Sequence, residues 1–586
     1  FWGLGADGTV GANKNSIKII GDHTDMYAQG YFDYDSKKSG GLTISHLRFG
    51  KSPIKSTYYI TKADFVACHN PAYIRKYDMV QDLKKGGSFL LNCEWSADEL
   101  DEKLPGKVKK FIADNGINFY IIDGFKLGKE IGLGTRINTI LQSAFFTIAN
   151  IIPADEATKY MKDAATKSYS KKGDAIVKMN HDAIDAGAKA FVKVDVPASW
   201  SNATDDSVKV VATGDRQDLV DYVNEVVLPV NTFHGKDLPV STFEKYADGM
   251  SHQGTAAYEK RGIAVDVPQW IPENCIQCNQ CSYVCPHAVI RPVPMTDAEL
   301  AAAPEGTKSK PMTGVEGMNF TMVISTLDCT GCGSCSQVCP AKQKALVMQP
   351  IDSQRPQQAV FDYAVKLPAK EAVAAKFKET SVKGSQFKQP LLEFSGACGG
   401  CGETPYAKLA TQLFGNKMFI ANATGCSSIW GGSAPATPYT VDKNGHGPAW
   451  ENSLFEDNAE FGLGMQLAQN ANRGRLAELT EKLIAIDYCD EAIKTAGKNW
   501  LETMKDTKAN DSATKAYIAA LEDAVMTVDE NIAFMESPMA KDVFGDNLPA
   551  MLEHAKARKA AGEKYCDCEA CTLALEILKD KDFLAK

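Results

Sequence analysis

Short apolar runs alternate with helical periodicity along the first 213 residues of the chain. Five runs rich in β-branched and aromatic residues predict strands, at 16–20, 41–48, 65–68, 88–93 and 118–123. Residues 71–83 and 134–149 lie between such runs and have the length and pattern of helices. Alternation of strand and helix is typical of an open α/β sheet, so we predict one α/β domain over residues 1–213.

The pattern changes after this domain. Residues 214–254 are polar and contain several prolines and glycines, which predicts a connecting segment. Residues 255–371 hold two cysteine repeats, separated by an insertion at 296–318 that is rich in Ala, Pro, Gly and Lys and predicts a surface loop. Residues 372–586 begin as mixed structure and become rich in Ala, Glu and Lys from 473 to 584, which predicts a helical excursion.

Composition and charge restrict the function. The chain has 586 residues, enough for several domains, and its net charge of −9 argues against nucleic acid as the main partner. The most apolar stretch, 137–153, carries Asn138, Gln142 and Ser143, so we predict a buried helix there and no membrane association. Seventeen cysteines without a signal peptide indicate a reducing compartment, which we take to be the cytoplasm. Because it begins at Phe1, we expect the chain to be part of a longer polypeptide.

Two copies of the pattern C-x-x-C-x-x-C-x-x-x-C-P stand in residues 255–371. They comprise Cys275, Cys278, Cys281 and Cys285, and then Cys329, Cys332, Cys335 and Cys339. This is the spacing of a ferredoxin with two 4Fe–4S clusters, and it predicts a ferredoxin-like α+β domain. The fourth cysteine of each copy lies one helical turn beyond the third and points away from its own cluster. We therefore predict that Cys339 completes the first triad and Cys285 the second.

Two other roles for these cysteines are less well supported. Zinc requires separated pairs of ligands that close a tetrahedron, which this spacing does not suit. A disulfide framework requires an oxidising compartment, and nothing else in the sequence indicates secretion.

Other cysteines leave alternatives open. Cys398 and Cys401 lie in a glycine-rich C-x-x-C, and Cys426 follows in a second small-residue loop. The pattern favours a cluster but also allows a redox dithiol or isolated thiols. For the trio Cys566, Cys568 and Cys571, reduced thiols at a helix start are favoured over metal binding, because no histidine or fourth cysteine stands nearby in the sequence. Cys68, Cys93 and Cys489 lie in apolar patterns and are expected to be core thiols, and His287 is expected to lie at the surface.

Three segments of the first domain carry features of anion sites. The loop 3–14 is rich in glycine and ends in lysine, so its backbone N–H groups can cradle a phosphate or merely form a tight turn. Lys37 and Lys38 stand in a loop of small residues, where a solvated pair is the alternative. Arg136 precedes a predicted helix and can meet an anion or pair with a surface carboxylate.

The order of these motifs resembles the family of pyruvate:ferredoxin (flavodoxin) oxidoreductases, over essentially the whole chain. The resemblance rests on FWGLGADGTVGANK at 1–14, SHLRFG at 45–50, the paired cysteine repeats, GACGGCGETP at 396–405 and NSLFEDNAEFG at 452–462. It implies a coenzyme A domain, a domain with two clusters, and part of a thiamine diphosphate domain with a proximal cluster. Cys398, Cys401 and Cys426 would be ligands of that proximal cluster, making three 4Fe–4S clusters.

The resemblance also assigns cofactor contacts. Coenzyme A phosphates are expected at ten residues: Gly5, Asp7, Gly8, Thr9, Gly11, Asn13, Lys14, Lys37, Lys38 and Arg136. Gly425 and Ser427, beside Cys426, are expected near the thiamine cofactor. The family's Mg²⁺ and diphosphate signature is absent from this sequence and is expected beyond Lys586, together with the fourth proximal ligand. The unit that binds pyruvate is expected before Phe1, so catalytic residues are expected largely outside this chain.

The implied activity is oxidative decarboxylation of pyruvate with coenzyme A to acetyl-CoA and CO₂. Electrons would leave one at a time through the clusters to ferredoxin or flavodoxin, and the family resemblance implies a homodimer. One alternative is another 2-oxoacid:ferredoxin oxidoreductase, since the substrate pocket lies largely outside this sequence. The other is an electron-transfer module without catalysis of its own.

Overall fold

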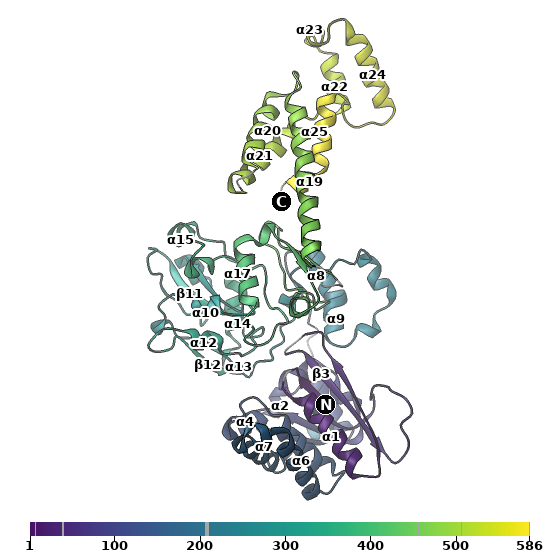
Figure 1. The fold of residues 1–586 in the computed structure, drawn as a ribbon, viewed down its shortest axis with the longest axis vertical. Coiled ribbons are helices and arrows are strands. Elements are labelled where there is room, and N and C mark those ends of the chain that lie inside the picture. The colour runs from purple at the N-terminus through teal and green to yellow at the C-terminus, as the bar shows by residue number, and fades with distance from the viewer. Residues whose placement is uncertain (6, 38–39, 205–209, 454–457, 505–506, 585–586) are drawn as a thin grey trace. The chain divides into compact units, whose positions relative to one another are not determined.

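The computed structural model describes residues 1–584 apart from 6, 38–39, 205–209, 454–457 and 505–506 (Figure 1). It divides into two compact units, each described by itself below. Unit 1 comprises Phe1–Met418 and Asn422–Leu454, and unit 2 comprises Phe419–Ala421 and Phe455–Lys586. The division of the chain into domains at 213, 254 and 371 stays a prediction.

A seven-stranded sheet organises the first part of unit 1. Its strands stand in the order β2-β3-β1-β4-β5-β6-β7. Their bounds are β1 (Trp2–Leu4), β2 (Tyr27–Tyr34), β3 (Leu42–Gly50), β4 (Ala63–Cys68), β5 (Leu83–Asn92), β6 (Asn118–Ile122) and β7 (Val192–Lys193). The four central strands β1, β4, β5 and β6 are parallel, whereas β3 pairs antiparallel with both β1 and β2, and β7 pairs antiparallel with β6. The open α/β sheet expected from the sequence is thus confirmed.

Helices cover both faces of this sheet (Figure 1). One face carries α1 (Thr9–His23), α4 (Gly124–Ile131), α5 (Asn138–Ala149), α6 (Ala154–Tyr169) and α7 (Asp174–Gly187). The other face carries the short α2 (Leu100–Lys103) and α3 (Gly106–Asp114). Buried residues of α5, among them Ile140, Leu141 and Phe146, confirm the predicted buried helix. Layers on both faces bury the parallel strands and leave their carboxyl ends at one edge.

Two predicted elements of this domain are wrong. Residues 16–20 belong to α1, because Ala12, Ser16, Ile19 and Ile20 are buried together at helical spacing. Residues 71–83 form two 3₁₀ turns, Pro71–Arg75 and Met79–Asp82, and not one helix. The strands β1 and β2 had no counterpart in the prediction, since β1 has three residues and β2 faces solvent along most of its length.

The cluster-binding segment contains two similar units, each a cysteine repeat flanked by two strands. β8 (Asp266–Trp270) and β9 (Ile290–Met295) flank the first cysteine repeat, and β11 (Asn319–Ile324) and β12 (Leu346–Pro350) flank the second. The pairs cross over, because β9 pairs with β11 and β8 pairs with β12, all antiparallel. Each repeat carries one short helix, α10 (Gln280–Tyr283) or α12 (Ser334–Val338). This exchange of strands is the ferredoxin-like arrangement that the sequence predicts.

The other elements up to residue 452 are short. In chain order they are α8 (Gln217–Tyr222), α9 (Leu228–Asn231), α11 (Asp297–Ala301), β10 (Lys310–Pro311), α13 (Ile351–Gln354), α14 (Gln357–Ala364), α15 (Glu371–Lys376), α16 (Val382–Ser385), α17 (Thr404–Phe414), β13 (Phe419–Asn422), α18 (Cys426–Gly431) and β14 (Ala449–Asn452). The insertion 296–318 is therefore a loop interrupted by α11 and β10, and α11 begins with a capping box of Thr296 and Glu299.

Unit 2 is helical, as the composition predicts. Its helices are α19 (Asn458–Ile484), α20 (Glu491–Thr503), α21 (Thr507–Ala524), α22 (Val528–Met535), α23 (Ala540–Phe544), α24 (Leu548–Ala560), α25 (Glu569–Lys579) and α26 (Lys581–Leu584). In Figure 1, α19 and α25 run side by side, and their shared core contains Leu476, Leu483, Trp500, Tyr517 and Ile577.

Among the described residues, we find no helix with both the length and the apolar character needed to cross a membrane.

Candidate cluster and anion sites

The two cysteine repeats adopt the same local backbone. Gln277 and Asn279 of the first repeat have positive φ angles of 56° and 60°. Gly331 and Gly333 stand at the equivalent places of the second repeat, with φ angles of 70° and 75°. In each repeat the backbone N–H two residues after the first cysteine donates to that cysteine's sulfur at 3.4 Å. This curled loop turns successive cysteines toward one centre and supplies N–H groups that stabilise thiolate ligands.

One pocket gathers four cysteines from both repeats. Cys285, the last of the first repeat, lines it together with Cys329, Cys332 and Cys335 of the second. Burial raises the pKa of the Cys329 thiol well above its usual range, and the neighbouring Cys285 sulfur adds to the shift. A set of four cysteines, three of them buried and Cys332 half-buried, fits a 4Fe–4S cluster, in which bound iron keeps each ligand deprotonated. This grouping agrees with the predicted exchange of Cys285.

The first triad forms a second centre. Desolvation raises the pKa of the half-buried Cys281 thiol well above its usual range, and sulfurs of Cys335, Cys275 and Cys278 add to the rise. Cys339 is tied to this loop through Lys344, whose ammonium donates to the Cys339 carbonyl oxygen at 2.7 Å. The Lys344 carbonyl oxygen in turn accepts from Asn274, the residue before Cys275, at 3.1 Å.

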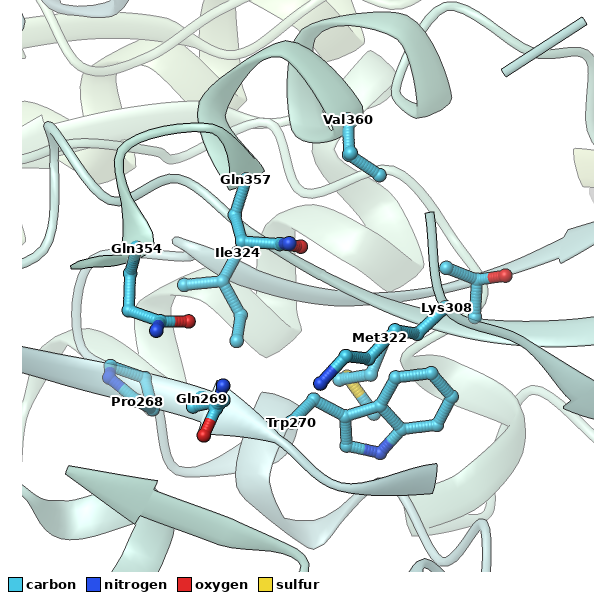
Figure 2. Close-up of a pocket in the computed structure, with 10 residues that line it drawn as sticks. Pro268, Gln269, Trp270, Lys308, Met322, Ile324, Gln354, Gln357 and Val360 are labelled. Carbon is cyan, nitrogen blue, oxygen red and sulfur yellow. The ribbon is translucent and has the colours of Figure 1, made fainter. Parts of the chain in front are cut away.

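A further pocket of this segment is not a cluster site. It lies between β8, β11 and the helices α13 and α14, and Figure 2 shows Trp270, Met322, Ile324, Gln354 and Gln357 around it. No cysteine or carboxylate belongs to the described residues that line it. Amide and apolar side chains do not ligate iron, so this pocket carries no argument about electron transfer.

The glycine-rich loop with Cys398 and Cys401 lies against the second cysteine repeat. A Cβ placed on Gly399 would meet the Cys332 Cβ at 3.6 Å, and one on Gly400 would meet the Ser334 hydroxyl at 3.6 Å. The Cys401 sulfur accepts from the Glu403 N–H at 3.4 Å, the same contact that marks the repeats. This loop therefore places a third thiolate group beside the second centre.

Cys426 approaches the same loop from α18. It begins this helix, and Trp430 on the same helix donates its indole N–H to the Glu403 carboxylate at 3.4 Å. Cys426 is exposed, whereas Cys398 and Cys401 are half-buried. Gly425 and Ser427 flank Cys426, and Gly425 N–H donates to the Ser428 hydroxyl at 2.8 Å. The three cysteines thus stand on neighbouring elements, with one side open to solvent.

His287 is buried, contrary to the surface position expected from the sequence. Its exposed fraction is 2%, and its Nδ1 lies 3.1 Å from the Ser395 carbonyl oxygen. Burial lowers the pKa of His287 to about 4, so the ring is neutral at pH 7. Its own carbonyl oxygen accepts from the Phe394 N–H at 2.9 Å. The ring therefore fixes the segment that leads into the Cys398 loop.

Lys408 is a functional candidate that the sequence analysis missed. It lies on α17, is 2% exposed, and donates to the carbonyl oxygens of Ser282, Tyr283 and Cys285. Burial lowers the pKa of Lys408 to about 8, and the neighbouring Cys285 opposes that shift. The ammonium therefore caps the carboxyl end of α10 and places a positive charge beside Cys285.

The glycine-rich loop after β1 forms the other candidate site. It leads directly into α1 at the carboxyl edge of the parallel strands. Gly8 has a φ of 90° and caps α1 without a side-chain hydrogen bond, so N–H groups of the first turn face the edge of the sheet. A Cβ on Gly8 would meet the Asn138 side chain at 2.7 Å, which brings the amino ends of α1 and α5 together. Two helix amino ends at one edge favour an anion.

Polar side chains line this edge, and one of them competes with an anion. The Thr9 hydroxyl lies 2.7 Å from Nδ1 of His69, and the Asn13 amide nitrogen is buried without a partner among the described residues. Burial lowers the pKa of His69 to about 3, so this ring stays neutral. The Asp7 carboxylate already accepts the N–H groups of Leu4 and Thr9, at 2.9 and 2.7 Å.

The remaining residues expected at this site differ in their surroundings. The Gly5 N–H donates to the Gly41 carbonyl oxygen at 2.6 Å and holds the two loops together. Gly11 and Lys14 are exposed on α1, and the Lys14 ammonium lies 5.4 Å from the Phe32 ring centre. Arg136 is exposed two residues before α5, next to the joined helix ends.

Of the two lysines expected at this site, the structure describes one. Lys37 is buried and its ammonium lies 2.7 Å from the Glu259 carboxylate, so its charge is already compensated. Lys38 lies outside the described residues.

Three family models match successive parts of the chain. The model described as pyruvate ferredoxin/flavodoxin oxidoreductase matches residues 1–190, which hold the seven-stranded sheet apart from β7. A model described as a domain of unknown function matches residues 211–264. The 4Fe-4S dicluster domain matches residues 274–343, which contain both cysteine repeats. The cysteine geometry and this last match together assign 4Fe–4S clusters to the segment.

Curated relatives extend the likeness beyond these models. Pyruvate:ferredoxin oxidoreductase of Moorella thermoacetica is 57% identical over 509 residues, and pyruvate-flavodoxin oxidoreductase of Enterobacter agglomerans is 54% identical over 506 residues. Each match covers 86% of this chain and 42% of the relative, so the chain spans about two fifths of their length. The NADP(+) pyruvate dehydrogenase of Cryptosporidium parvum is 47% identical over 517 residues, covering 84% of this chain and 26% of that protein. Over the part of these enzymes that it spans, this chain belongs to the pyruvate:ferredoxin/flavodoxin oxidoreductase family.

Proposed function

We propose that this chain is the electron-conducting and coenzyme A-binding portion of an enzyme that oxidises pyruvate. The complete reaction would convert pyruvate and coenzyme A to acetyl-CoA and CO₂ and pass electrons singly to ferredoxin or flavodoxin. The observation that carries the proposal is the pocket that Cys285 shares with Cys329, Cys332 and Cys335, with the Cys398 loop packed beside it. Adjacent thiolate sites in one chain are what stepwise electron transfer requires.

The chain's own residues hold and insulate these sites. When bound, 4Fe–4S clusters supply one-electron redox chemistry. The curled loops direct cysteine sulfurs inward, and backbone N–H groups at Gln277, Gly331 and Glu403 stabilise the thiolates. Lys408 adds a positive charge beside Cys285. We propose Cys398, Cys401 and Cys426 as ligands of a third cluster, with Gly425 and Ser427 beside a thiamine diphosphate–Mg²⁺ site completed by other parts of the enzyme.

Coenzyme A is proposed to bind at the carboxyl edge of the seven-stranded sheet. Gly8 precedes α1 and offers no side-chain cap, Asn13 has a buried amide without a partner among the described residues, and Arg136 supplies an exposed cation. These are the groups that phosphate recognition uses. Asp7 repels an anion at the same loop, so we expect the phosphate to lie toward α5 and Arg136. A homodimer and a cytoplasmic location remain part of the proposal.

The test is pyruvate- and coenzyme A-dependent reduction of ferredoxin by an anaerobically purified protein that carries this chain. We expect Cys329→Ser to abolish ferredoxin reduction while decarboxylation of pyruvate persists, because carbon chemistry lies upstream of this centre. We expect Arg136→Ala to raise the KM for coenzyme A about tenfold through loss of one charged hydrogen bond. Lys110→Ala, at an exposed site on α3, serves as the control.

Iron analysis and substrate choice complete the test. An iron content that corresponds to three 4Fe–4S clusters, each detected by EPR after reduction, would support the proposal. An iron content that corresponds to two clusters would show that Cys398, Cys401 and Cys426 are not cluster ligands. Faster turnover with 2-oxoglutarate than with pyruvate would contradict the substrate. Direct reduction of NADP(+) by the protein would identify NADP(+), and not ferredoxin or flavodoxin, as the electron acceptor. One relative is named for that acceptor. Failure to decarboxylate any 2-oxoacid would favour an electron-transfer module.

A further inference from the structure

Three cysteines of unit 2 lie far from the cluster motifs in the sequence and are drawn together by the fold. The ligand atoms of Cys566, Cys568 and Cys571 all lie within 4.8 Å of one another. Tyr565 pairs with Thr527 in an isolated antiparallel bridge, and α25 begins at Glu569, so Cys566 and Cys568 lie in the turn between these two elements and Cys571 lies in the first turn of α25. Cys566 and Cys571 are buried and Cys568 is half-buried. This turn is therefore held at both ends and shielded from solvent.

Backbone N–H groups donate to these sulfurs, as they do to the first cysteine of each ferredoxin repeat. The Cys568 N–H donates to the Cys566 sulfur at 3.4 Å, and the Cys571 N–H donates to the Cys568 sulfur at 3.4 Å. The same distance occurs at Cys275 and Cys329 in the two repeats. N–H donors directed at sulfur favour the thiolate over the thiol, and the thiolate is the form that binds metal.

The spacing of the sulfurs distinguishes a single ion from a cluster. Zinc–sulfur bonds of about 2.3 Å in a tetrahedron place the sulfurs about 3.8 Å apart, and the sulfurs of this trio all lie within 4.8 Å of one another. Throughout the part of the chain that the structure describes, the cysteines of the ferredoxin repeats do not form so tight a group. Sulfurs that bind the corners of an iron–sulfur cube stand farther apart. The separation of the three sulfurs therefore suits a single metal ion and not an iron–sulfur cluster.

A further buried thiol, Cys489, packs in the core to which α25 contributes, although it lies 77 residues before Cys566 in the sequence. Cys489 precedes α20 and packs in the same core as Ala574 and Ile577 of α25. The trio supplies three sulfurs, and a thiolate at Cys489 would complete the closed set of four ligands that structural zinc sites use.

We propose that Cys489, Cys566, Cys568 and Cys571 bind one Zn²⁺ ion, which joins the α19–α20 turn to the start of α25. Four soft thiolate ligands select zinc over magnesium or calcium, and a closed tetrahedron leaves no position for substrate. The ion therefore has a structural role: it fixes the α19–α20 turn to the first turn of α25. This role is separate from the clusters and from the proposed oxidation of pyruvate.

The experiment measures metal content and ligand type in the full chain, purified anaerobically from cells supplied with zinc. We expect about one zinc per chain by mass spectrometry of the elements, beside the iron of the clusters. X-ray absorption at the zinc edge should show four sulfur neighbours at about 2.3 Å. Neither readout requires turnover, so failure of the proposed enzymatic function would leave this result unaffected.

Variants decide which thiols hold the ion. Cys568→Ser and Cys489→Ser are each expected to lower zinc content at least tenfold, with iron content and helical circular dichroism unchanged. Cys93→Ala, which removes a buried thiol of unit 1, should keep zinc and is the matched control. Zinc at wild-type levels in Cys568→Ser would overturn the site, as would a Cys568–Cys571 disulfide or rapid alkylation of the trio in the native chain. Zinc retained in Cys489→Ser would overturn the four-thiolate assignment.

Discussion

At the scale of single residues, one buried charge distinguishes the cluster segment from a simple ferredoxin loop. Lys408 donates to three carbonyl oxygens at the end of α10, and these belong to Ser282, Tyr283 and Cys285. The last carbonyl groups of a helix have no partner within the helix, so the ammonium satisfies groups that burial would otherwise leave unpaired. The same charge lies beside a cluster ligand, where it favours the more negative, reduced state.

Replacing Lys408 by methionine should therefore change both stability and redox behaviour. We expect a loss of about 1–3 kcal/mol in the free energy of unfolding, because buried carbonyl oxygens lose their donor. We also expect the midpoint potential of one cluster to become more negative, measured by EPR-monitored titration. Lys388→Met, which removes a half-exposed lysine paired with Glu379, should leave the potential unchanged. An unchanged potential in Lys408→Met would show that the charge acts on the fold alone.

The sequence does not reveal Lys408 because its helix inverts the usual pattern. The buried face of α17 consists of Thr404, Lys408, Thr411 and Gln412. Pattern analysis assigns polar positions to solvent, and these four have the spacing of an exposed face. Their burial depends on carbonyl groups of another segment, which no local pattern records. His287 was placed at the surface for the same reason, although it packs against the Ser395 backbone.

At the scale of elements, the exchange of fourth cysteines follows from crossed strand pairing. Each repeat is flanked by two strands, and each strand pairs with a strand of the other repeat. Cys285 stands between α10 and β9, so it lies near β11 and the second loop that follows it. Spacing alone predicted this exchange because three closely spaced cysteines fill one loop. One pocket groups Cys285 with Cys329, Cys332 and Cys335, and the assignment of cluster ligands stays a prediction. Residues 16–20 of α1, in contrast, were mistaken for a strand, because a helix turn and a short strand share a run such as Ile17–Ile20.

Replacing the fourth cysteine of one repeat should remove the cluster that the other repeat's three cysteines hold. In Cys285→Ser we expect Cys329, Cys332 and Cys335 to become reactive toward N-ethylmaleimide, with Cys275, Cys278 and Cys281 still protected. In Cys339→Ser we expect the reverse pattern, because its sulfur completes the first triad. Peptide mass spectrometry after brief anaerobic alkylation reads both sets in one sample. Loss of protection in the same repeat as the substitution would contradict the exchange.

At the scale of the whole molecule, a buried ion pair joins two segments of unit 1. Lys37 follows β2 of the seven-stranded sheet, and Glu259 precedes β8 of the cluster segment. Their charged atoms lie 2.7 Å apart, and each side chain is only 5% exposed. Arg261 donates to the Gly40 carbonyl oxygen at 2.9 Å, and Asn70 donates to the Ile263 carbonyl oxygen at 3.2 Å, along the same junction. The sequence offered Lys37 as a phosphate contact or as part of a solvated lysine pair, since a partner more than 200 residues away has no local signature.

Replacing either Lys37 or Glu259 alone should destabilise the junction, whereas replacing both should largely restore its stability. Glu259→Leu removes the nearer of two carboxylates from the buried Lys37 ammonium and leaves Asp35 at 3.6 Å, and Lys37→Met removes the ammonium from the buried Glu259 carboxylate. Each single change costs up to about 3–5 kcal/mol. The double variant removes both charges of the pair and leaves only the half-buried Asp35 without its Lys37 contact, so its cost should be well below the sum of the two single costs. Hydrogen–deuterium exchange of residues 40–45 and 259–264 measures the opening locally and avoids assuming two-state unfolding of a chain with several domains. Both single variants should exchange at least a hundredfold faster there, and additive costs in the double variant would show that Lys37 and Glu259 do not stabilise the junction through each other.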